Sequence, residues 1–288
     1  MSKVLIATEK PFAAPAVAGI KQILTEAGFE VVLLEKYTTK AELLAAVADV
    51  EAIIIRSDII DAEVFDAAKQ LKIVVRAGAG YDNVDLESAT AHGVCVMNTP
   101  GQNANAVAEL VFAMLLFCVR NRFNGTSGTE LKDKKLGLLA YGNTGRNVAR
   151  IAKGFGMDIY AYDPFTPAEV IEKEGVHAVA SQKELFSTCD IVSLHIPATP
   201  ETKGSIGREL VSLMPKKGIL VNTARKEVIN EPELIALLKE REDLRYFADI
   251  RPGAHEEFEA AAGDRYFSTP KKMGAQTAEA NNKAGIAA

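Results

Sequence analysis

Short runs of apolar, often β-branched residues alternate with amphipathic stretches along the first hundred residues. The strand-like runs are residues 3–8, 31–34, 52–57 and 72–78, and the helical stretches are residues 14–27, 40–48 and 61–69. Strands that alternate with helices form parallel sheets through crossover connections, so this pattern predicts an α/β domain. The runs are apolar at consecutive positions, which is typical of strands covered on both faces of a sheet.

A second series of the same kind begins near residue 135. Its strand-like runs are KLGLLAYG (135–142), MDIYAYD (157–163), VHAVA (176–180), DIVSLHIP (190–197), GILVNTA (218–224) and RYFADI (245–250). Two such series predict an α/β chain with two doubly wound, parallel-sheet domains. A polar, glycine-containing stretch at 121–135 is predicted to be a loop.

Residues 103–121 lie between the two series and have the composition of a helix. This stretch is apolar nearly all round after Glu109. A helix without a polar face must be buried on several sides. We therefore expect it either in a domain core or packed between subunits.

Composition narrows the class of protein. The 288 residues are 48% hydrophobic and 25% charged, as in an ordinary globular protein with a sizeable core. The net charge of -5 argues against nucleic acid or an acidic membrane as a partner. The N-terminus lacks the pattern of a signal peptide, and the longest apolar run, 110–119, is about half of a membrane span. We expect a cytoplasmic protein.

The three cysteines, Cys95, Cys118 and Cys189, are widely spaced and each lies in an apolar segment. An odd number at this spacing predicts free, buried thiols in a reducing compartment and no metal site.

Residues 136–165 have the strand, turn, helix and strand of a dinucleotide fingerprint. Gly142 would let the backbone approach a pyrophosphate, and Gly145 would let the helix pack on the strand. The helix N-terminus, beginning at Asn143 and Thr144, would offer N–H groups to the phosphates. A glycine-rich turn can also serve packing alone, but Asp163 lies at the end of the second strand, 18 residues beyond Gly145.

Asp163 indicates which dinucleotide binds. Its carboxylate can bind both ribose hydroxyls and would repel a 2′-phosphate, and no arginine follows in DPFTP (163–167). NAD is therefore expected rather than NADP. Ala140 replaces the first glycine of the fingerprint, and we expect it to keep a negative φ, because alanine disfavours positive values.

Four further segments occur in a recognisable order. They are VVRAGAGYDNVDL (74–86), NTPGQNANAVAEL (98–110), LHIPATPETKGSIG (194–207) and LVNTARKEVINEPEL (220–234). With the fingerprint, they resemble the D-2-hydroxyacid dehydrogenase family, and most closely its branch that oxidises D-3-phosphoglycerate. The resemblance covers nearly the whole chain.

The resemblance implies a Rossmann NAD-binding domain, residues 101–275, and a flavodoxin-like substrate domain, residues 1–100 plus 276–288. It also implies an active site in the cleft separating them and a homodimer formed through the NAD-binding domains. Such a dimer would explain the apolar helix between the two series.

Site residues follow from the resemblance position by position. Arg225 would bind the substrate carboxylate and polarise the carbonyl, because its planar fork suits a bidentate carboxylate; the alternative is a surface salt bridge. Asp249 would hold the nicotinamide, or else cap a strand end. The other implied cofactor contacts are His195, Pro197, Thr202, Thr223 and Ala224. His195 is interpreted as structural and not catalytic, and His92, His177 and His255 as surface residues.

The resemblance also implies the substrate contacts. The N–H groups of Ala79 and Gly80 would grip the substrate carboxylate, and Asn103 would face the substrate. The candidates for its phosphate are Arg56, with Ser57, and Arg76, each near the carboxyl end of a strand, where α/β sheets bind ligands. Either arginine could instead be an ordinary solvated charge.

The turn before the last predicted helix departs from the family. The family usually has Pro-His-x-Gly, whose histidine exchanges a proton with the substrate oxygen, whereas this chain has Pro270-Lys271-Lys272-Met273-Gly274. Counting from the proline selects Lys271, and counting from the glycine selects Lys272. The glutamate that assists the histidine is also absent from DIRPGAHEEF (249–258).

These two departures fit together. A lysine paired with a carboxylate would stay an ammonium, whereas a partly desolvated lysine beside Arg225 without an acid partner is expected to have a lowered pKa. It could then accept a proton from an alcohol and return one to a ketone. The chain resembles a short branch in which lysine replaces the histidine. The alternative is that both lysines are solvated, or bind only phosphate, in an inactive site.

The sequence therefore predicts NAD-dependent oxidation of D-3-phosphoglycerate, a small phosphorylated 2-hydroxy acid, to 3-phosphohydroxypyruvate at the start of serine synthesis. The first alternative is a glyoxylate or hydroxypyruvate reductase, which would need no phosphate site. The second is a non-enzymatic, NAD-sensing binding protein on the same fold.

Overall fold

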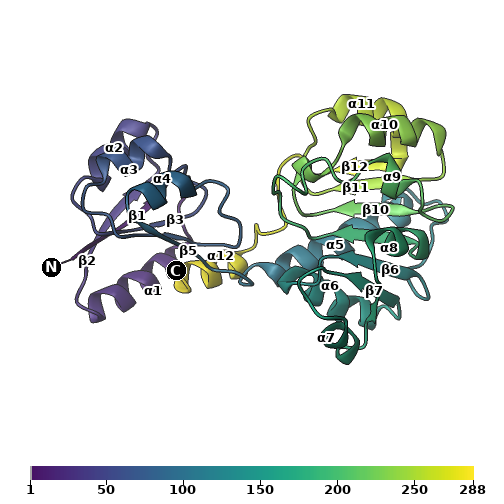
Figure 1. The fold of residues 1–288 in the computed structure, drawn as a ribbon, viewed down its shortest axis with the longest axis horizontal. Helices are drawn as coiled ribbons and strands as arrows, with labels where there is room; N and C mark the ends of the chain where they lie inside the picture. Colours follow the sequence, from purple (N-terminus) through teal and green to yellow (C-terminus); the bar gives the residue numbers. More distant parts are fainter. Residues whose placement is uncertain (1) are drawn as a thin grey trace. The chain divides into compact units, whose positions relative to one another are not determined.

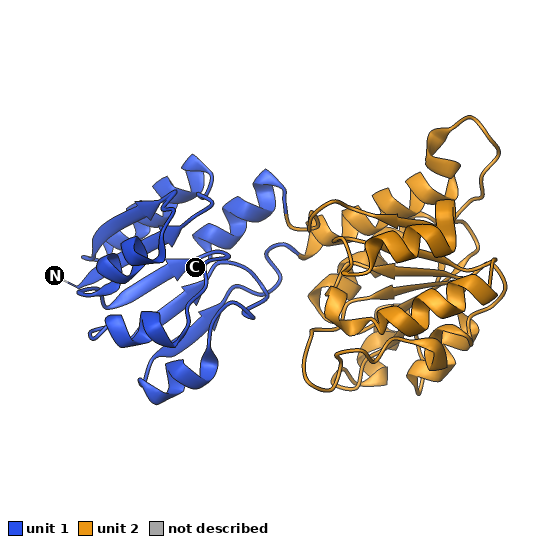
Figure 2. Cartoon of the chain, turned by 90° about the horizontal axis from the view of Figure 1, so that it is seen from above, with its two compact units in different colours: residues 1–103, 276–288 blue, residues 104–275 orange. Residues whose placement is uncertain are grey.

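The computed structural model describes residues 2–288, which form two compact units (Figure 2). Unit 1 comprises residues 1–103 and 276–288, and unit 2 comprises residues 104–275. Unit 1 is therefore assembled from both ends of the chain.

Unit 1 contains a five-stranded parallel sheet in the order β2-β1-β3-β4-β5, the flavodoxin-like order. Its elements are β1 (Lys3–Thr8), α1 (Ala14–Glu26), β2 (Glu30–Glu35), α2 (Lys40–Val47), β3 (Ala52–Ile55), α3 (Ala62–Ala67), β4 (Ile73–Arg76), α4 (Leu86–Ala91), β5 (Cys95–Asn98) and α12 (Ala278–Ile286). Apolar residues of α2, α3 and α4 pack on one face, and α1 covers the other with α12 beside it (Figure 1).

The C-terminal helix α12 lies directly against α1. A Cβ atom placed on Gly285 would be 3.2 Å from the Cβ of Ala16, closer than most side-chain contacts. Glycine therefore permits this close packing of the two helices.

Unit 2 contains a seven-stranded parallel sheet in the order β12-β11-β10-β9-β6-β7-β8. Its elements are α5 (Ala104–Val119), η1 (Asn121–Phe123), β6 (Lys135–Leu139), α6 (Asn143–Gly154), β7 (Asp158–Tyr162), α7 (Ala168–Lys173), β8 (His177–Ala178), α8 (Gln182–Thr188), β9 (Ile191–Leu194), α9 (Arg208–Val211), β10 (Ile219–Asn222), η2 (Lys226–Val228), α10 (Glu231–Glu240), β11 (Arg245–Ala248), α11 (His255–Ala262), η3 (Gly263–Arg265) and β12 (Tyr266–Ser268). Apolar residues of α5, α6 and α7 form the core on one face, and those of α8 to α11 form it on the other. The strand order changes direction between β6 and β9. In sheets of this kind, ligands bind at the carboxyl ends of the two strands where the order changes.

Helix starts in both units follow local sequence rules. Polar side chains at the N-cap accept a hydrogen bond from the N–H three residues later, which satisfies a donor that the helix leaves unpaired. These N-cap residues are Asp61, Asp85, Ser181, Asn230 and Thr277.

The apolar helix predicted at 103–121 is α5. Val111, Phe112 and Leu115 are buried in the core of unit 2, whereas Leu116 and Phe117 are only half-buried. No helix among residues 2–288 is long and apolar enough to cross a membrane.

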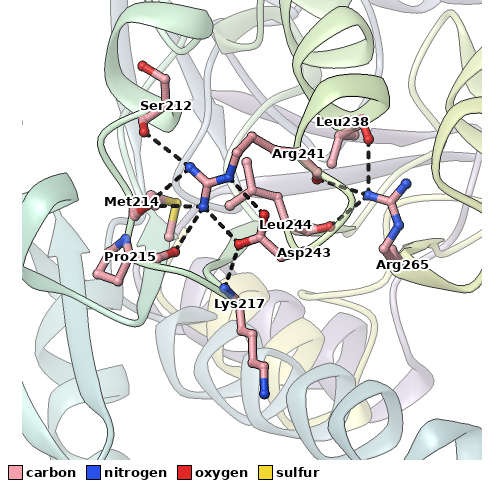
Figure 3. Close-up of polar contacts among 9 residues, drawn as sticks. All are labelled: Ser212, Met214, Pro215, Lys217, Leu238, Arg241, Asp243, Leu244 and Arg265. Carbon is pink, nitrogen blue, oxygen red and sulfur yellow. Dashed lines mark hydrogen bonds and ion pairs between the residues drawn. The ribbon is translucent and has the colours of Figure 1, made fainter.

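A partly exposed polar network fixes the ends of α9 and α10 (Figure 3). The Arg241 guanidinium donates to both oxygens of Asp243, each at 2.8 Å, and to the Ser212 carbonyl at 3.3 Å. Asp243 also accepts the Lys217 N–H at 2.7 Å. Arg265 donates to carbonyl groups at the C-terminal end of α10. These residues hold the loops on the side of the sheet that α9 and α10 cover.

Two short edge strands, β5 and β12, are missing from the sequence-based prediction. Their position has a consequence for the cysteines. Cys118 and Cys189 are buried as expected, but Cys95, the first residue of the edge strand β5, is exposed. The prediction that all three thiols are buried is therefore wrong for Cys95.

Candidate active site

The fingerprint turn connects β6 to α6. A Cβ atom placed on Gly145 would lie 2.4 Å from the Ala140 carbonyl oxygen, so only glycine lets α6 start this close to the turn. A Cβ atom on Gly142 would meet nothing within 4 Å, and no side chain caps the first turn of α6. Open space above an uncapped helix N-terminus, which begins at Asn143 and Thr144, is suited to a pyrophosphate.

Ala140 differs from the expectation. Its φ is +81°, not negative. The Ala140 N–H donates to the Tyr162 carbonyl at 2.9 Å, which continues the pairing of β6 with β7, and its carbonyl then turns toward Gly145. These long-range constraints hold an alanine in a conformation that glycine would adopt without strain.

Asp163 lies just past the end of β7 and is fixed by backbone donors. Its Oδ2 accepts the Tyr141 N–H at 2.7 Å, and its Oδ1 accepts the Phe165 N–H at 2.8 Å. The carboxylate is thereby placed beside the fingerprint turn, as ribose binding requires. Together, Gly142, Gly145 and Asp163 fit a dinucleotide.

The segment after β9 contains the predicted cofactor contacts His195, Pro197 and Thr202. The His195 N–H donates to the Leu139 carbonyl at 2.9 Å, and its buried Nε2 has no hydrogen-bond partner within residues 2–288. Burial lowers the pKa of His195 to about 4, so the ring is neutral at pH 7. The Thr202 hydroxyl donates to the Pro197 carbonyl at 2.6 Å and closes the following loop. The interpretation of His195 as a structural residue stays a prediction.

Asn222, Thr223, Ala224 and Arg225 form a tight turn at the end of β10. The buried Asn222 side chain accepts the Ala224 N–H at 3.0 Å and donates to the Arg225 carbonyl at 2.9 Å. The Arg225 guanidinium is near its own backbone, with Nη1 3.1 Å from the Ala224 carbonyl oxygen. Asn222 therefore determines where the Arg225 side chain leaves the sheet.

The two lysines lie in different environments. Lys271 is exposed, whereas Lys272 is half-buried and its Nζ donates to the Ala224 carbonyl at 2.6 Å. The same carbonyl oxygen accepts from Arg225, so the ammonium and the guanidinium share an acceptor. Of the two candidates, Lys272 is the one that the fold of unit 2 brings to Arg225. The Asp249 carboxylate lies at this turn and accepts hydrogen bonds from its backbone.

In unit 1, the predicted phosphate ligands lie at the carboxyl ends of adjacent parallel strands, with Arg76 ending β4 and Arg56 following β3. Ile55, which precedes Arg56, pairs in register with Arg76. Arg56 donates to the carbonyls of Lys10, at 3.2 Å, and Pro11, at 3.0 Å, and to Asn281 of α12 at 2.7 Å. These three bonds use three of its five N–H groups.

The loop after β4 carries the remaining substrate candidates. Gly78 has a φ of +145°, and a Cβ atom there would overlap the Arg76 guanidinium. The Ala79 carbonyl accepts a hydrogen bond from Asn98 at 2.7 Å, which fixes the backbone next to Gly80. Ser57 is exposed and Asn103 is half-buried.

Comparison with known proteins identifies the family. Residues 113–266, more than half of the chain, match the model of the D-isomer specific 2-hydroxyacid dehydrogenase, NAD binding domain. The chain belongs to the D-isomer specific 2-hydroxyacid dehydrogenase family. All of the matched residues lie within unit 2, and the predicted fold class and NAD cofactor are confirmed.

Two curated relatives differ in their stated activity. A D-3-phosphoglycerate dehydrogenase of Methanocaldococcus jannaschii is 38% identical over 269 residues, which are 86% of this chain and 50% of the relative. A hydroxypyruvate reductase of Thermotoga maritima is 35% identical over 278 residues, 89% of this chain and 88% of the relative. The chain thus spans about half the length of the phosphoglycerate dehydrogenase and most of the reductase.

A solved structure is also similar. NAD+-bound 3-phosphoglycerate dehydrogenase of Entamoeba histolytica has a TM-score of 0.90 and 47% sequence identity, covering 99% of this chain and 92% of that one. This dehydrogenase chain therefore has the same two-sheet architecture as a cofactor-bound relative.

Sequence reasoning missed two polar residues of this dehydrogenase, Asn222 and Thr269. Both are buried, and both take part in the hydrogen bonds of a turn that carries a predicted catalytic side chain. The available signal was their position at the end of a strand, since Asn222 ends β10 and Thr269 follows β12.

His255 was predicted to be a surface residue, and this is wrong. Its side chain is 14% exposed and its Nδ1 lies 2.9 Å from the hydroxyl of the buried Tyr266. The start of α11 turns His255 toward β12, a tertiary contact without a local sequence signal. His92 and His177 are exposed as expected.

Proposed function

We propose that this chain oxidises D-3-phosphoglycerate to 3-phosphohydroxypyruvate with NAD, the reaction that begins serine synthesis, in the cytoplasm. The observation that supports this most directly is the Lys272 ammonium and the Arg225 guanidinium on one carbonyl, that of Ala224. A proton-transfer group next to a carboxylate-binding group is what oxidation of a 2-hydroxy acid requires. Bound NAD would supply the hydride acceptor, held by the α6 N-terminus and Asp163.

The roles of the side chains follow from their chemistry. Arg225 pairs with the substrate carboxylate, since a guanidinium binds a carboxylate through two parallel hydrogen bonds. Lys272 in its uncharged form accepts the proton of the substrate hydroxyl, and as an ammonium returns it to the carbonyl oxygen in reduction. The N–H groups of Ala79 and Gly80 add donors to the carboxylate, with Asn103 facing the substrate.

Arg56 and Arg76, with Ser57, bind the phosphate. Both arginines lie at the carboxyl ends of the adjacent strands β3 and β4, so their positive charges add there. Arg56 donates to the oxygens of Lys10, Pro11 and Asn281 through three of its five N–H groups. The other N–H groups can donate to one or more phosphate oxygens.

We further propose that the active protein is a homodimer formed through unit 2. Phe123 is 69% exposed and contacts the half-buried Phe117 of α5 edge-on, with ring centroids 5.5 Å apart. An exposed aromatic residue beside an apolar helix is typical of an interface. Sedimentation equilibrium tests this: a monomer at assay concentrations would contradict it.

The alternative within the family is a hydroxypyruvate or glyoxylate reductase, which the Thermotoga maritima relative favours. The two activities differ in their need for the phosphate. The deciding assay measures NADH formation from D-3-phosphoglycerate, and NADH consumption with 3-phosphohydroxypyruvate and with glyoxylate.

Three variants accompany the wild type. Lys272→Ala is expected to lower kcat by about 10²- to 10⁴-fold, the usual contribution of a general base, whereas the neighbouring Lys271→Ala is the matched control and stays near wild type. Arg56→Ala is expected to raise KM for phosphorylated substrates only. Full activity of Lys272→Ala contradicts the proton-transfer role, and equal use of glyoxylate contradicts the phosphate site.

A further inference from the structure

Asp249 is a buried carboxylate at the end of β11, and only 1% of it is exposed. Its Oδ1 accepts the Thr269 hydroxyl at 2.9 Å and the Met273 N–H at 2.7 Å. Its Oδ2 accepts the Gly274 N–H at 2.8 Å. Every one of these donors belongs to the segment 269–274, so the carboxylate holds the turn on which both lysines lie.

A buried carboxylate is costly unless hydrogen bonds satisfy it. Charge-assisted bonds of this length are about twice as strong as neutral ones, so three of them form a firm anchor. Gly274 also belongs to the turn that Asp249 anchors. A Cβ atom there would lie 2.9 Å from Asp249 Oδ2 and 3.2 Å from Val107 Cγ2, so a side chain would push the turn away from the carboxylate.

The hydrogen bonds of Asp249 constrain Lys272 through the backbone of the turn. Lys272 directly precedes Met273, whose N–H is held by Asp249. The Lys272 Nζ donates to the Ala224 carbonyl, which follows β10, the strand paired with β11. Asp249 thus fixes the backbone end of the lysine, and Ala224 fixes its amine. Both anchors belong to neighbouring strands of one sheet.

We propose that Asp249 is a positioning residue for Lys272, a role additional to the contact with the nicotinamide that the family resemblance implies. The proposal rests on the proposed function of Lys272. A lysine side chain has many rotamers, and a turn that is free to shift would spread the amine over many positions. Misplacement of a reacting group by about 1 Å can lower the rate by about 100-fold.

The experiment is a double-mutant cycle of Asp249→Asn and Lys272→Met, with Asp243→Asn as the control. Asp243 is also an aspartate of unit 2 that accepts a backbone N–H, but it lies in the network of Arg241. Three quantities are measured: kcat at saturating substrates, the dissociation constant of NADH by fluorescence, and hydrogen exchange of the amides at residues 273 and 274.

Asp249→Asn is expected to lower kcat by about 10- to 100-fold, and a change in NADH affinity would report separately on its contact with the nicotinamide. The exchange of the two amides is expected to become about 10- to 100-fold faster, the range for loss of a bond to a charged group. The double variant is expected to be no slower than Lys272→Met alone, because Asp249 acts through Lys272. Asp243→Asn is expected to leave kcat and both amides unchanged.

Other outcomes separate the two hypotheses. Weaker NADH binding with unchanged kcat, or losses that multiply in the double variant, refute the positioning role and assign Asp249 to the cofactor alone. Full activity of Lys272→Met refutes the proposed function of Lys272, and slow amide exchange in that variant shows that Asp249 still holds the turn.

If Asp249→Asn does not fold, Thr269→Val provides the test. It removes one donor to Oδ1 and keeps the carboxylate, so kcat is expected to fall by about 3- to 10-fold, as for one hydrogen bond. Unchanged kcat and amide exchange in this variant would overturn the proposal.

Discussion

Ala140 offers a direct test of how the fingerprint turn is built. This residue has a φ of +81°, and its N–H is held by the Tyr162 carbonyl. Ala140→Gly keeps the main-chain contacts and removes only the Cβ atom. The substitution therefore isolates the energy stored in the conformation of one residue.

The magnitude follows from two opposing terms. The left-handed region costs an L-amino acid about 1–2 kcal/mol, which glycine would recover. Glycine also gives the unfolded chain more freedom, which costs about 0.4–1 kcal/mol of stability. We expect a net stabilisation of about 0.5–1 kcal/mol. For a domain of the size of unit 2, this raises Tm by roughly 1–4 °C.

The assay is thermal and urea unfolding of wild type and variant, with Ala113→Gly as the control. Ala113 is an exposed residue inside α5, where glycine is expected to lower the free energy of unfolding by about 1 kcal/mol. The two alanine-to-glycine changes thus have opposite predicted signs. Equal destabilisation by both would refute the reasoning, because Ala140 would then carry no strain.

Three further predictions concern other residues of unit 2. Asp163→Arg is expected to raise kcat/KM for NADP relative to NAD, since a charge that repels the 2′-phosphate becomes one that attracts it; an unchanged ratio in steady-state kinetics contradicts this. Gly274→Ala is expected to destabilise unit 2 by about 1–3 kcal/mol in urea unfolding, because its Cβ would lie 2.9 Å from Asp249 Oδ2. Hydrogen bonding from Arg241 lowers the pKa of Asp243 below its ordinary 3.8, so its stabilisation is present above about pH 4 and is lost as the pH falls below that value. The free energy of unfolding of Asp243→Asn is therefore expected to differ from wild type more at about pH 7 than at about pH 3, and equal differences would contradict the ion-pair explanation.

The sequence by itself determined the fold class and the nucleotide-binding turn. Both depend on local patterns: apolar runs of strand length, amphipathic stretches between them, and glycines with an acid at fixed spacing. The strands β1, β6 and β7 and the helices α1 and α5 lie within a few residues of their predicted positions. Short edge strands such as β5 and β12 were missed, because only pairing with a neighbour makes them strands.

Only the tertiary structure decided which groups meet. The sequence left Lys271 and Lys272 equivalent, and the pairing of β10 with β11 brings Lys272 to the Ala224 carbonyl. It likewise gave no sign that the Asp249 carboxylate would be saturated by a turn about twenty residues away. Contacts of this kind depend on the register of strands and the path of loops between them, which a local pattern does not specify.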